Sequence, residues 1–233
     1  MATAACTESN GATDVGSRFI LSADYPLPVV ESDPPELPAT VTDASDTSVT
    51  VSDASRIVVL NQAVAEIVIS LGMKENIIGR DATTTLESLQ AVEEVSNGHD
   101  VSAESVLSLR PTVVIGDTRT GPPEAIEQLR GAGIAVVIAP EVWTLSALPA
   151  RVMLIASALG VPKAGERLVN LSESAIDDAL KNIGAASSVL RVAFLYVRGT
   201  ASVYLLGGEG SGADEVIAAA GGVDVGALNG LAA

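Results

Sequence analysis

The stretch Ser102-Ala-Glu-Ser-Val-Leu-Ser-Leu-Arg-Pro-Thr-Val-Val-Ile115 contains a helix start, a helix stop and the beginning of a buried strand. Ser102 is expected to cap the first turn of a short helix. Pro111 ends that helix because its ring cannot continue the backbone hydrogen bonds. The apolar run over 112–117 then predicts a strand that is buried on both faces. A helix that leads directly into such a strand is typical of a parallel α/β sheet.

The same alternation continues on either side of this stretch. Strands that alternate with short helices form parallel sheets whose two faces are both covered. The fold class is therefore predicted to be α/β, and residues 53–144 are predicted to form a first lobe. Apolar runs predict strands, and helical spacing predicts helices, over 56–61, 63–71, 77–79, 123–130 and 134–139.

Two helices in succession interrupt the alternation after residue 144. They are predicted over 145–159 and 162–183, and the second has an amphipathic stripe. A long helix between two sheet-forming regions predicts a rigid connector over residues 145–184.

The remaining residues, 185–233, predict a second lobe that is incomplete. Residues 189–197 and 202–206 are expected to be strands, and Ser211 is expected to cap a helix over 212–220. This lobe has too few elements to cover a sheet, which predicts a truncated chain of marginal stability. The first lobe with the long helix is expected to be its better-folded part.

Residues 1–52 differ in composition from the rest of the chain. They are acidic and rich in Pro, Ser and Thr, so we expect a disordered tether. Cys6 follows a run of small residues, which resembles the end of a bacterial lipoprotein signal, although the charged and apolar parts of such a signal do not precede it. The interpretation is that Cys6 carries a lipid anchor; the alternative is an ordinary cysteine in a tail.

Composition excludes several functions. The chain has 233 residues and a formal net charge of −16, which disfavours nucleic acid as a partner. One cysteine and one histidine exclude the usual zinc spacings. The sequence contains no nucleophile–base pattern, and the glycines at 207, 208 and 210 lack the Lys-Ser/Thr ending of a phosphate-binding loop. We therefore expect a binding protein and no enzyme.

The region from about residue 55 onward resembles the substrate-binding proteins of bacterial ABC importers for cobalamin, ferric siderophores and haem. The match is most specific over 102–115, and the strands over 56–61 and 131–138 are also similar. The resemblance implies two α/β lobes joined by a long helix, with the ligand in the cleft between them. It also implies a location outside the cytoplasmic membrane, and a permease with its ATPase as partners. Glu104 corresponds to the acid that docks on the permease, although an acid in the first helical turn also complements the helix dipole.

Within this family the sequence resembles the HmuT-type haemin-binding lipoproteins. That resemblance implies that His99 and Tyr196 bind ferric haem iron from opposite faces, and that Arg198 hydrogen-bonds the Tyr196 oxygen. Phenolate is a hard ligand that suits Fe(III), and Asp100 is a candidate to orient the His99 imidazole. Tyr204 is a competing phenol.

Other interpretations stay open at this point. A siderophore or corrinoid receptor would make His99 and Tyr196 incidental, and a surface haem scavenger or adhesin would have no permease. Trp143, Met73 and Met153 are expected to be packing residues.

Overall fold

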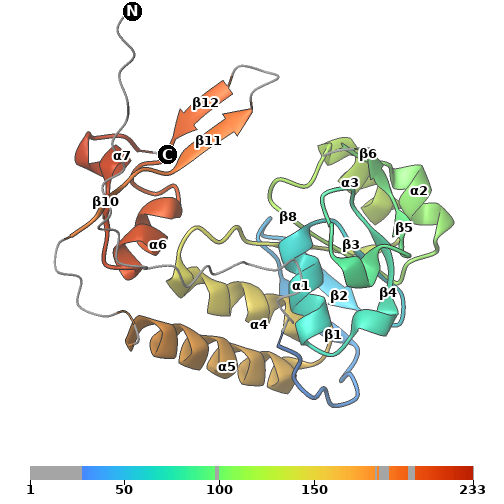
Figure 1. The fold of residues 1–233 in the computed structure, drawn as a ribbon. Helices are drawn as coiled ribbons and strands as arrows, with labels where there is room; N and C mark the ends of the chain where they lie inside the picture. The colour runs from blue at the N-terminus through green and yellow to red at the C-terminus, as the bar shows by residue number, and fades with distance from the viewer. Residues whose placement is uncertain (1–27, 98–99, 182, 184–188, 199–202, 233) are drawn as a thin grey trace, which may run out of the picture.

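The computed structural model describes residues 28–97, 100–181, 183, 189–198 and 203–232 (Figure 1). The strands are β1 (Ala39–Thr42), β2 (Ser48–Val51), β3 (Ile57–Val59), β4 (Ile77–Arg80), β5 (Glu93–Glu94), β6 (Ser96–Asn97), β7 (Asp100–Val101), β8 (Val113–Asp117), β9 (Ala135–Ala139), β10 (Arg191–Val192), β11 (Leu195–Arg198), β12 (Val203–Leu206) and β13 (Val223–Asp224). The α-helices are α1 (Gln62–Ser70), α2 (Ala103–Ser108), α3 (Pro123–Gly131), α4 (Leu148–Ala158), α5 (Pro162–Lys181), α6 (Ala213–Ala219) and α7 (Val225–Leu228). Three short 3-10 helices, η1 (Lys74–Asn76), η2 (Glu87–Leu89) and η3 (Leu145–Ala147), complete the set.

A parallel sheet in the order β5-β4-β3-β8-β9 forms the centre of the first lobe. Successive side chains along its strands point into two buried clusters in turn, because side chains of a strand alternate between its two faces. In β8, Val113 and Ile115 belong to one cluster and Val114 belongs to the other. The central strands β3 and β8 are buried on both faces, which explains why they are continuous apolar runs.

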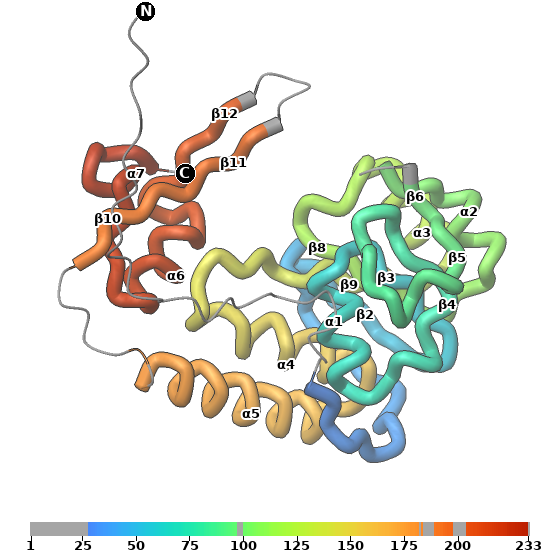
Figure 2. The backbone as a smooth tube through the Cα atoms, in the orientation of Figure 1, coloured from blue at the N-terminus to red at the C-terminus, as the bar shows by residue number. Residues whose placement is uncertain are grey.

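Helices cover both faces of this sheet (Figure 2). Helices α1 and α4 pack on one face, and α2 and α3 pack together on the other. Two side chains set the helix starts: Asn61 accepts from the amides of Ala63 and Val64, and Ser102 accepts from Ser105. The predicted α/β class with a parallel sheet is confirmed.

The expected tether over 1–52 is wrong for its second half. Strands β1 and β2 form an antiparallel hairpin, and Val49 and Val51 are buried in the core of the first lobe. The exposed positions of this hairpin are Ser and Thr, so its composition resembles a linker although its valines alternate as in a strand. Residues 1–27, with Cys6, lie outside the described residues.

The turn of this hairpin is fixed by a buried carboxylate. Asp43 accepts hydrogen bonds from the amides of Ser45, Thr47 and Ile138, and it pairs with Arg130 at 3.1 Å. Burial by itself would raise the pKa of Asp43, but the hydrogen bonds from the Ser45 hydroxyl and these amides outweigh it and lower the pKa below its ordinary value.

Helices α4 and α5 lie in the region predicted to be a connector, and they lead from the first lobe to the later elements (Figure 1). The turn between them needs Gly160, whose φ of +73° favours glycine. Glu36 donates its backbone N–H to the Gly160 carbonyl at 2.7 Å, which attaches the preceding segment to this turn. Among the described residues, no helix combines the length and apolar character needed to cross a bilayer.

The second lobe differs from its prediction in two details. The strand expected over 189–197 is divided, because β10 pairs in parallel with β13 whereas β11 turns back antiparallel with β12. Ser211 is not the cap of α6: the N-cap is Gly212 at φ +80°, and the Asp214 carboxylate accepts instead from the Gly210 amide.

Candidate functional site

Polar residues gather at the carboxyl edge of the first-lobe sheet. Asn61 follows β3, Asp81 follows β4, Asp117 ends β8 and Glu141 lies just after β9. Strands β3 and β8 are neighbours in the sheet. The strands that follow β3 in the chain, β4 and β5, lie on one side of this pair, and β9, which follows β8, lies on the other. In open α/β sheets, ligands bind at this kind of topological switch point, outside the carboxyl ends of the strands.

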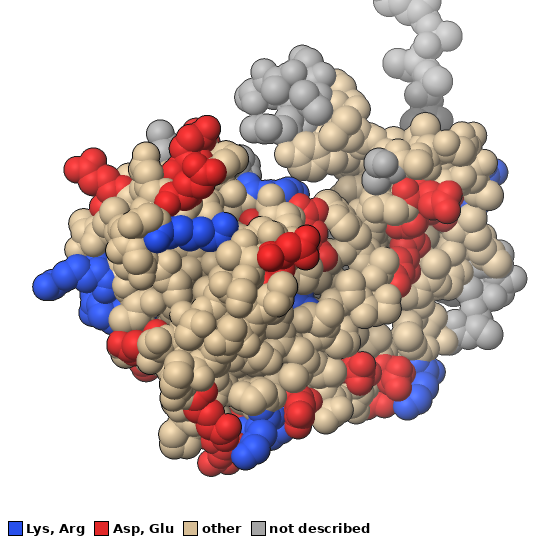
Figure 3. Space-filling view, turned by 180° about the vertical axis from the view of Figure 1, so that it is seen from behind, with Lys and Arg blue, Asp and Glu red and all other residues tan. Residues whose placement is uncertain are grey.

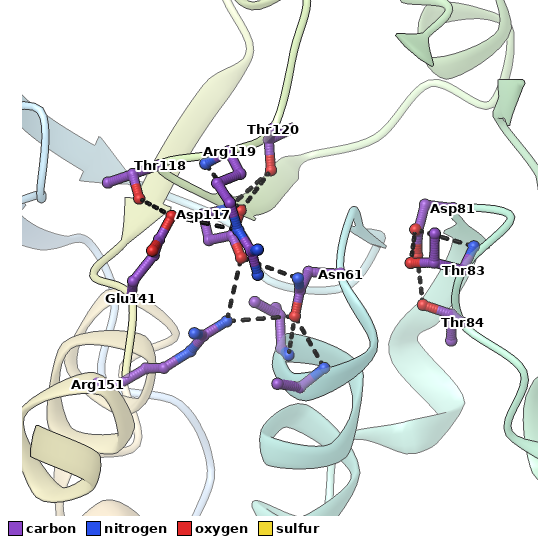
Figure 4. Close-up of polar contacts among 12 residues, drawn as sticks. Asn61, Asp81, Thr83, Thr84, Asp117, Thr118, Arg119, Thr120, Glu141 and Arg151 are labelled. Atoms are coloured by element: carbon purple, nitrogen blue, oxygen red, sulfur yellow. Dashed lines mark hydrogen bonds and ion pairs between the residues drawn. The ribbon is translucent and has the colours of Figure 1, made fainter. Parts of the chain in front are cut away.

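Asn61 and Asp117 of this edge form a largely buried network with Arg151 of α4 (Figure 4). Asn61 donates to the Asp117 carboxylate at 2.8 Å and accepts from an Arg151 Nη2 at 3.3 Å. The same Arg151 nitrogen lies 3.8 Å from Asp117. The network joins β3, β8 and α4, and so fixes the sheet edge against the first connector helix.

Arg151 is an unusual residue to find inside this lobe. Only 6% of its side chain is exposed, and its Nε has no hydrogen-bond partner in the part of the chain that the structure describes. Burial lowers the pKa of Arg151, and Arg119 adds to this, whereas the carboxylates of Asp117 and Glu141 raise it in part.

A second polar cluster lies beside this network and is more exposed. Arg119 pairs with Glu141 at 3.2 Å, and its guanidinium lies 5.5 Å from the centre of the Trp143 ring. Of the expected packing residues, Met73 is buried in the core, whereas Trp143 is 49% exposed. A cation above an indole face is a favourable arrangement.

The network and the exposed cluster border the same cavity, whose volume is about 420 Å³. Asn61, Asp117, Arg119, Trp143 and Arg151 are among its lining residues. A second hollow of about 410 Å³ lies along the same edge, between Asp81, Ser96 and Thr120. The hydroxyls of Thr83 and Thr84 donate to Asp81 there (Figure 4).

The hairpin β11–β12 carries the predicted tyrosine. Tyr196 pairs with Leu205 and Val197 pairs with Tyr204, so the two tyrosines occupy opposite faces of the hairpin. Tyr196 is 46% exposed. Arg198 lies two positions further along the same strand. Figure 3 shows the surface hollowed between the first lobe and this hairpin.

His99 lies outside the described residues, so the structure does not place it. Its neighbour Asp100 is in β7 and forms a bridge with Gly121, close to the Arg119 loop. Glu104 lies in the first turn of α2 and is exposed, where its charge complements the helix dipole.

Sequence reasoning missed Arg119, Trp143 and Arg151 as site residues. A signal was present for Arg119, because polar residues that directly follow a buried parallel strand lie at the ligand-binding edge. Arg151 gave no such signal, since it lies inside an otherwise apolar helix and only the packing of α4 brings it to the sheet edge.

Comparison with known proteins agrees with this geometry. Residues 57–230 match the family model described as "Periplasmic binding protein". The crystal structure of the heme-binding protein HmuT superposes with a TM-score of 0.78 at 36% identity, over 87% of this chain and 67% of that one. The periplasmic heme-binding protein RhuT from Roseiflexus sp. RS-1 gives a TM-score of 0.72 at 37% identity, over 77% of this chain and 69% of that one.

A curated relative is also similar. It is the "ABC transporter substrate-binding lipoprotein YvrC" of Bacillus subtilis (strain 168), which is 30% identical over 126 residues, or 53% of this chain and 40% of that protein. The matched region thus spans two fifths of this relative and about two thirds of HmuT.

The α/β fold, the connector helices and the polar sheet edge define a ligand-binding protein of the two-lobed type. The chain belongs to the periplasmic binding protein family.

Proposed function

We propose that this protein is an extracytoplasmic receptor of an ABC importer that binds ferric haem between its lobes and delivers it to the permease. Tyr196 and His99 would bind the iron from opposite faces, with Arg198 beside the Tyr196 oxygen. Cys6 would carry a lipid anchor, in keeping with the lipoprotein relative, and Glu104 would dock on the permease.

The observation that carries this proposal is the position of Tyr196. Its ring is half-exposed on a hairpin that faces a hollow in the surface (Figure 3), and Arg198 follows at the i+2 position of the same strand. Tyr204, the competing phenol, is on the opposite face of the hairpin. A phenolate presented in this way is suited to ferric iron.

The solved relatives support the same residues. HmuT has been solved with alanine in place of a histidine, of a tyrosine and of an arginine two residues after that tyrosine. His99, Tyr196 and Arg198 have the same order and nearly the same separation in this chain. HmuT and RhuT are both described as heme-binding proteins.

A haemin titration followed by absorption spectroscopy tests the proposal. We expect a saturable one-to-one Soret shift that His99→Ala and Tyr196→Phe both alter. Tyr204→Phe is the matched control, because it removes the same hydroxyl from the other face and should leave the spectrum unchanged. If haemin causes no shift and a ferric siderophore or cobalamin binds instead, the proposed ligand is wrong and that molecule takes its place in the proposal. Haem binding without binding to a permease would favour a scavenger.

A further inference from the structure

Arg151 holds a positive charge inside the first lobe without a full set of partners. Its side chain is 6% exposed, and among the described residues its guanidinium donates one hydrogen bond, to Asn61 at 3.3 Å. A guanidinium has five N–H donors, and burying one that is incompletely paired costs considerable free energy. A residue kept under these conditions indicates that something else completes its pairing.

The neighbouring carboxylate does not complete it. Asp117 is 3.8 Å away, and its oxygens already accept from Asn61, from the Arg119 amide at 3.0 Å and from the Thr120 hydroxyl at 3.3 Å. The Arg151 Nε remains unpartnered within the described residues. The unsatisfied group at this edge is therefore a donor with a positive charge.

The other acids that line the cavity already have polar partners. Glu141 pairs with Arg119 and accepts from the Thr118 hydroxyl at 3.0 Å, and Glu66 accepts from Gln62 at 3.0 Å. A cation entering the cavity would have to displace these partners, whereas an anion meets a guanidinium whose donors are incompletely used. The chemistry favours an anionic group of small size beside Arg151.

We propose that Arg151, with Arg119 nearer the surface, forms a subsite for a carboxylate of the bound ligand, which for a haem is a propionate side chain. This inference rests on the proposed function. Arg151 and Arg119 both line the cavity of about 420 Å³, and the half-exposed Trp143 ring borders it too. A short acidic arm that enters this cavity would meet the guanidinium groups of Arg119 and Arg151 among its lining residues.

The test compares haemin with haemin dimethyl ester, whose propionates are esterified and uncharged, on the unaltered chain in the same cosolvent. Each Kd is measured by Soret titration. A charge-assisted hydrogen bond contributes enough that we expect the ester to bind about tenfold more weakly, or worse. This comparison requires no substitution, so it stands whether or not the Arg151 variants fold.

Variants assign the effect to Arg151. Arg151→Met should weaken haemin binding by about the same tenfold factor and leave ester binding unchanged. The reason is that esterification of the ligand and removal of the guanidinium both abolish the same interaction. Arg151→Lys retains the charge and should fall between. Arg167→Met is the control, since Arg167 binds Glu31 and Asp33 outside the cavity. A melting curve checks that each variant is folded.

The outcomes separate the two proposals. Equal affinity for haemin and its ester would overturn the carboxylate subsite and leave haem binding intact. An ester effect that persists unchanged in Arg151→Met would also overturn the assignment to Arg151. Absence of any Soret change with haemin would overturn the proposed function, and the subsite with it.

Discussion

The side-chain amide of Asn61 donates to the Asp117 carboxylate at 2.8 Å and so ties the end of β3 to the end of β8. The oxygen of the same amide accepts from the Ala63 and Val64 backbone and caps α1. One side chain therefore fixes a helix start and the geometry of the sheet edge that borders the cavity.

Asn61→Ala should destabilise the first lobe. The change removes a helix cap, which is worth about 1 kcal/mol, and also removes one hydrogen bond each from the buried Asp117 and Arg151 side chains, so the total loss should be about 2 kcal/mol or more. Urea unfolding measures it, with Asn76→Ala as the control because Asn76 is hydrogen-bonded only weakly, at 3.5 Å, to Ser55. Equal losses for the two variants would contradict this role of Asn61.

Asp43 should make the protein sensitive to acid. Its pKa is lowered in the folded state, so the stability it contributes is present above its unfolded pKa of about 4 and is lost as the pH falls through the lower folded value. Asp43→Asn should reduce stability at pH 7 by about 2 kcal/mol, through the lost pairing with Arg130, and flatten the pH dependence below pH 4.

Urea midpoints between pH 2 and 7 test this sign. The exposed Glu127→Gln on α3 serves as the control and should keep the native acid dependence. If the urea midpoint falls as steeply below pH 4 in Asp43→Asn as in the native chain, groups other than Asp43 control the acid sensitivity.

Gly160→Ala should be more damaging than Gly133→Ala. Both glycines have positive φ, which costs an L-residue about 1–2 kcal/mol. A Cβ at Gly160 would also lie 2.7 Å from the Glu36 carbonyl oxygen, whereas a Cβ at Gly133 meets nothing within 4 Å. Thermal or urea unfolding of both variants should show the larger loss at Gly160, and the reverse order would mean that the 28–37 segment is not held at the α4–α5 turn.

Glu104→Gln should affect transport without affecting haem binding. If Glu104 docks on the permease, the variant should bind haemin with the native Kd but deliver it poorly to the reconstituted importer. The helix-dipole role alone would change stability by only about 0.3–1 kcal/mol. The control is Glu127→Gln on α3. If Glu104→Gln transports haem as well as this control and the native chain do, Glu104 does not dock on the permease and has only the helix-dipole role.

The second lobe should be cut by protease before the first. Phe194, Leu195 and Tyr196 are each about half exposed on two-stranded pairings, whereas the central first-lobe strands β3 and β8 are buried on both faces. Segments with few buried contacts open most readily. Limited chymotrypsin digestion should cleave within residues 189–206 while 28–181 stays intact; an early cut in β8 or α1 would contradict this.

The elements of the first lobe could be predicted because each combined a strong local signal with the burial the fold requires. The 102–117 region formed a Ser102-capped helix and a strand buried on both faces, as its spacing indicated. The β1–β2 hairpin was missed because half of its residues face water and are Ser or Thr, so its composition masked an alternation of valines that only packing against the first lobe makes significant.

The candidate site also combines a feature that the sequence shows with one that only the tertiary structure shows. The Tyr196-x-Arg198 pattern is a property of one strand, and its i, i+2 spacing is visible in the sequence alone. That Tyr204 occupies the other face depends on the register of β11 with β12, which is a pairing between strands.

What the sequence determined by itself is therefore the α/β class, the connector and the hairpin residues that carry the iron-binding prediction, because local spacing encodes them. What only the tertiary structure decided is the ordered hairpin before residue 52 and the meeting of Asn61, Asp117 and Arg151. Those three residues come from β3, β8 and α4, and it is the parallel order of the sheet and the packing of α4 on it that bring them within hydrogen-bonding distance.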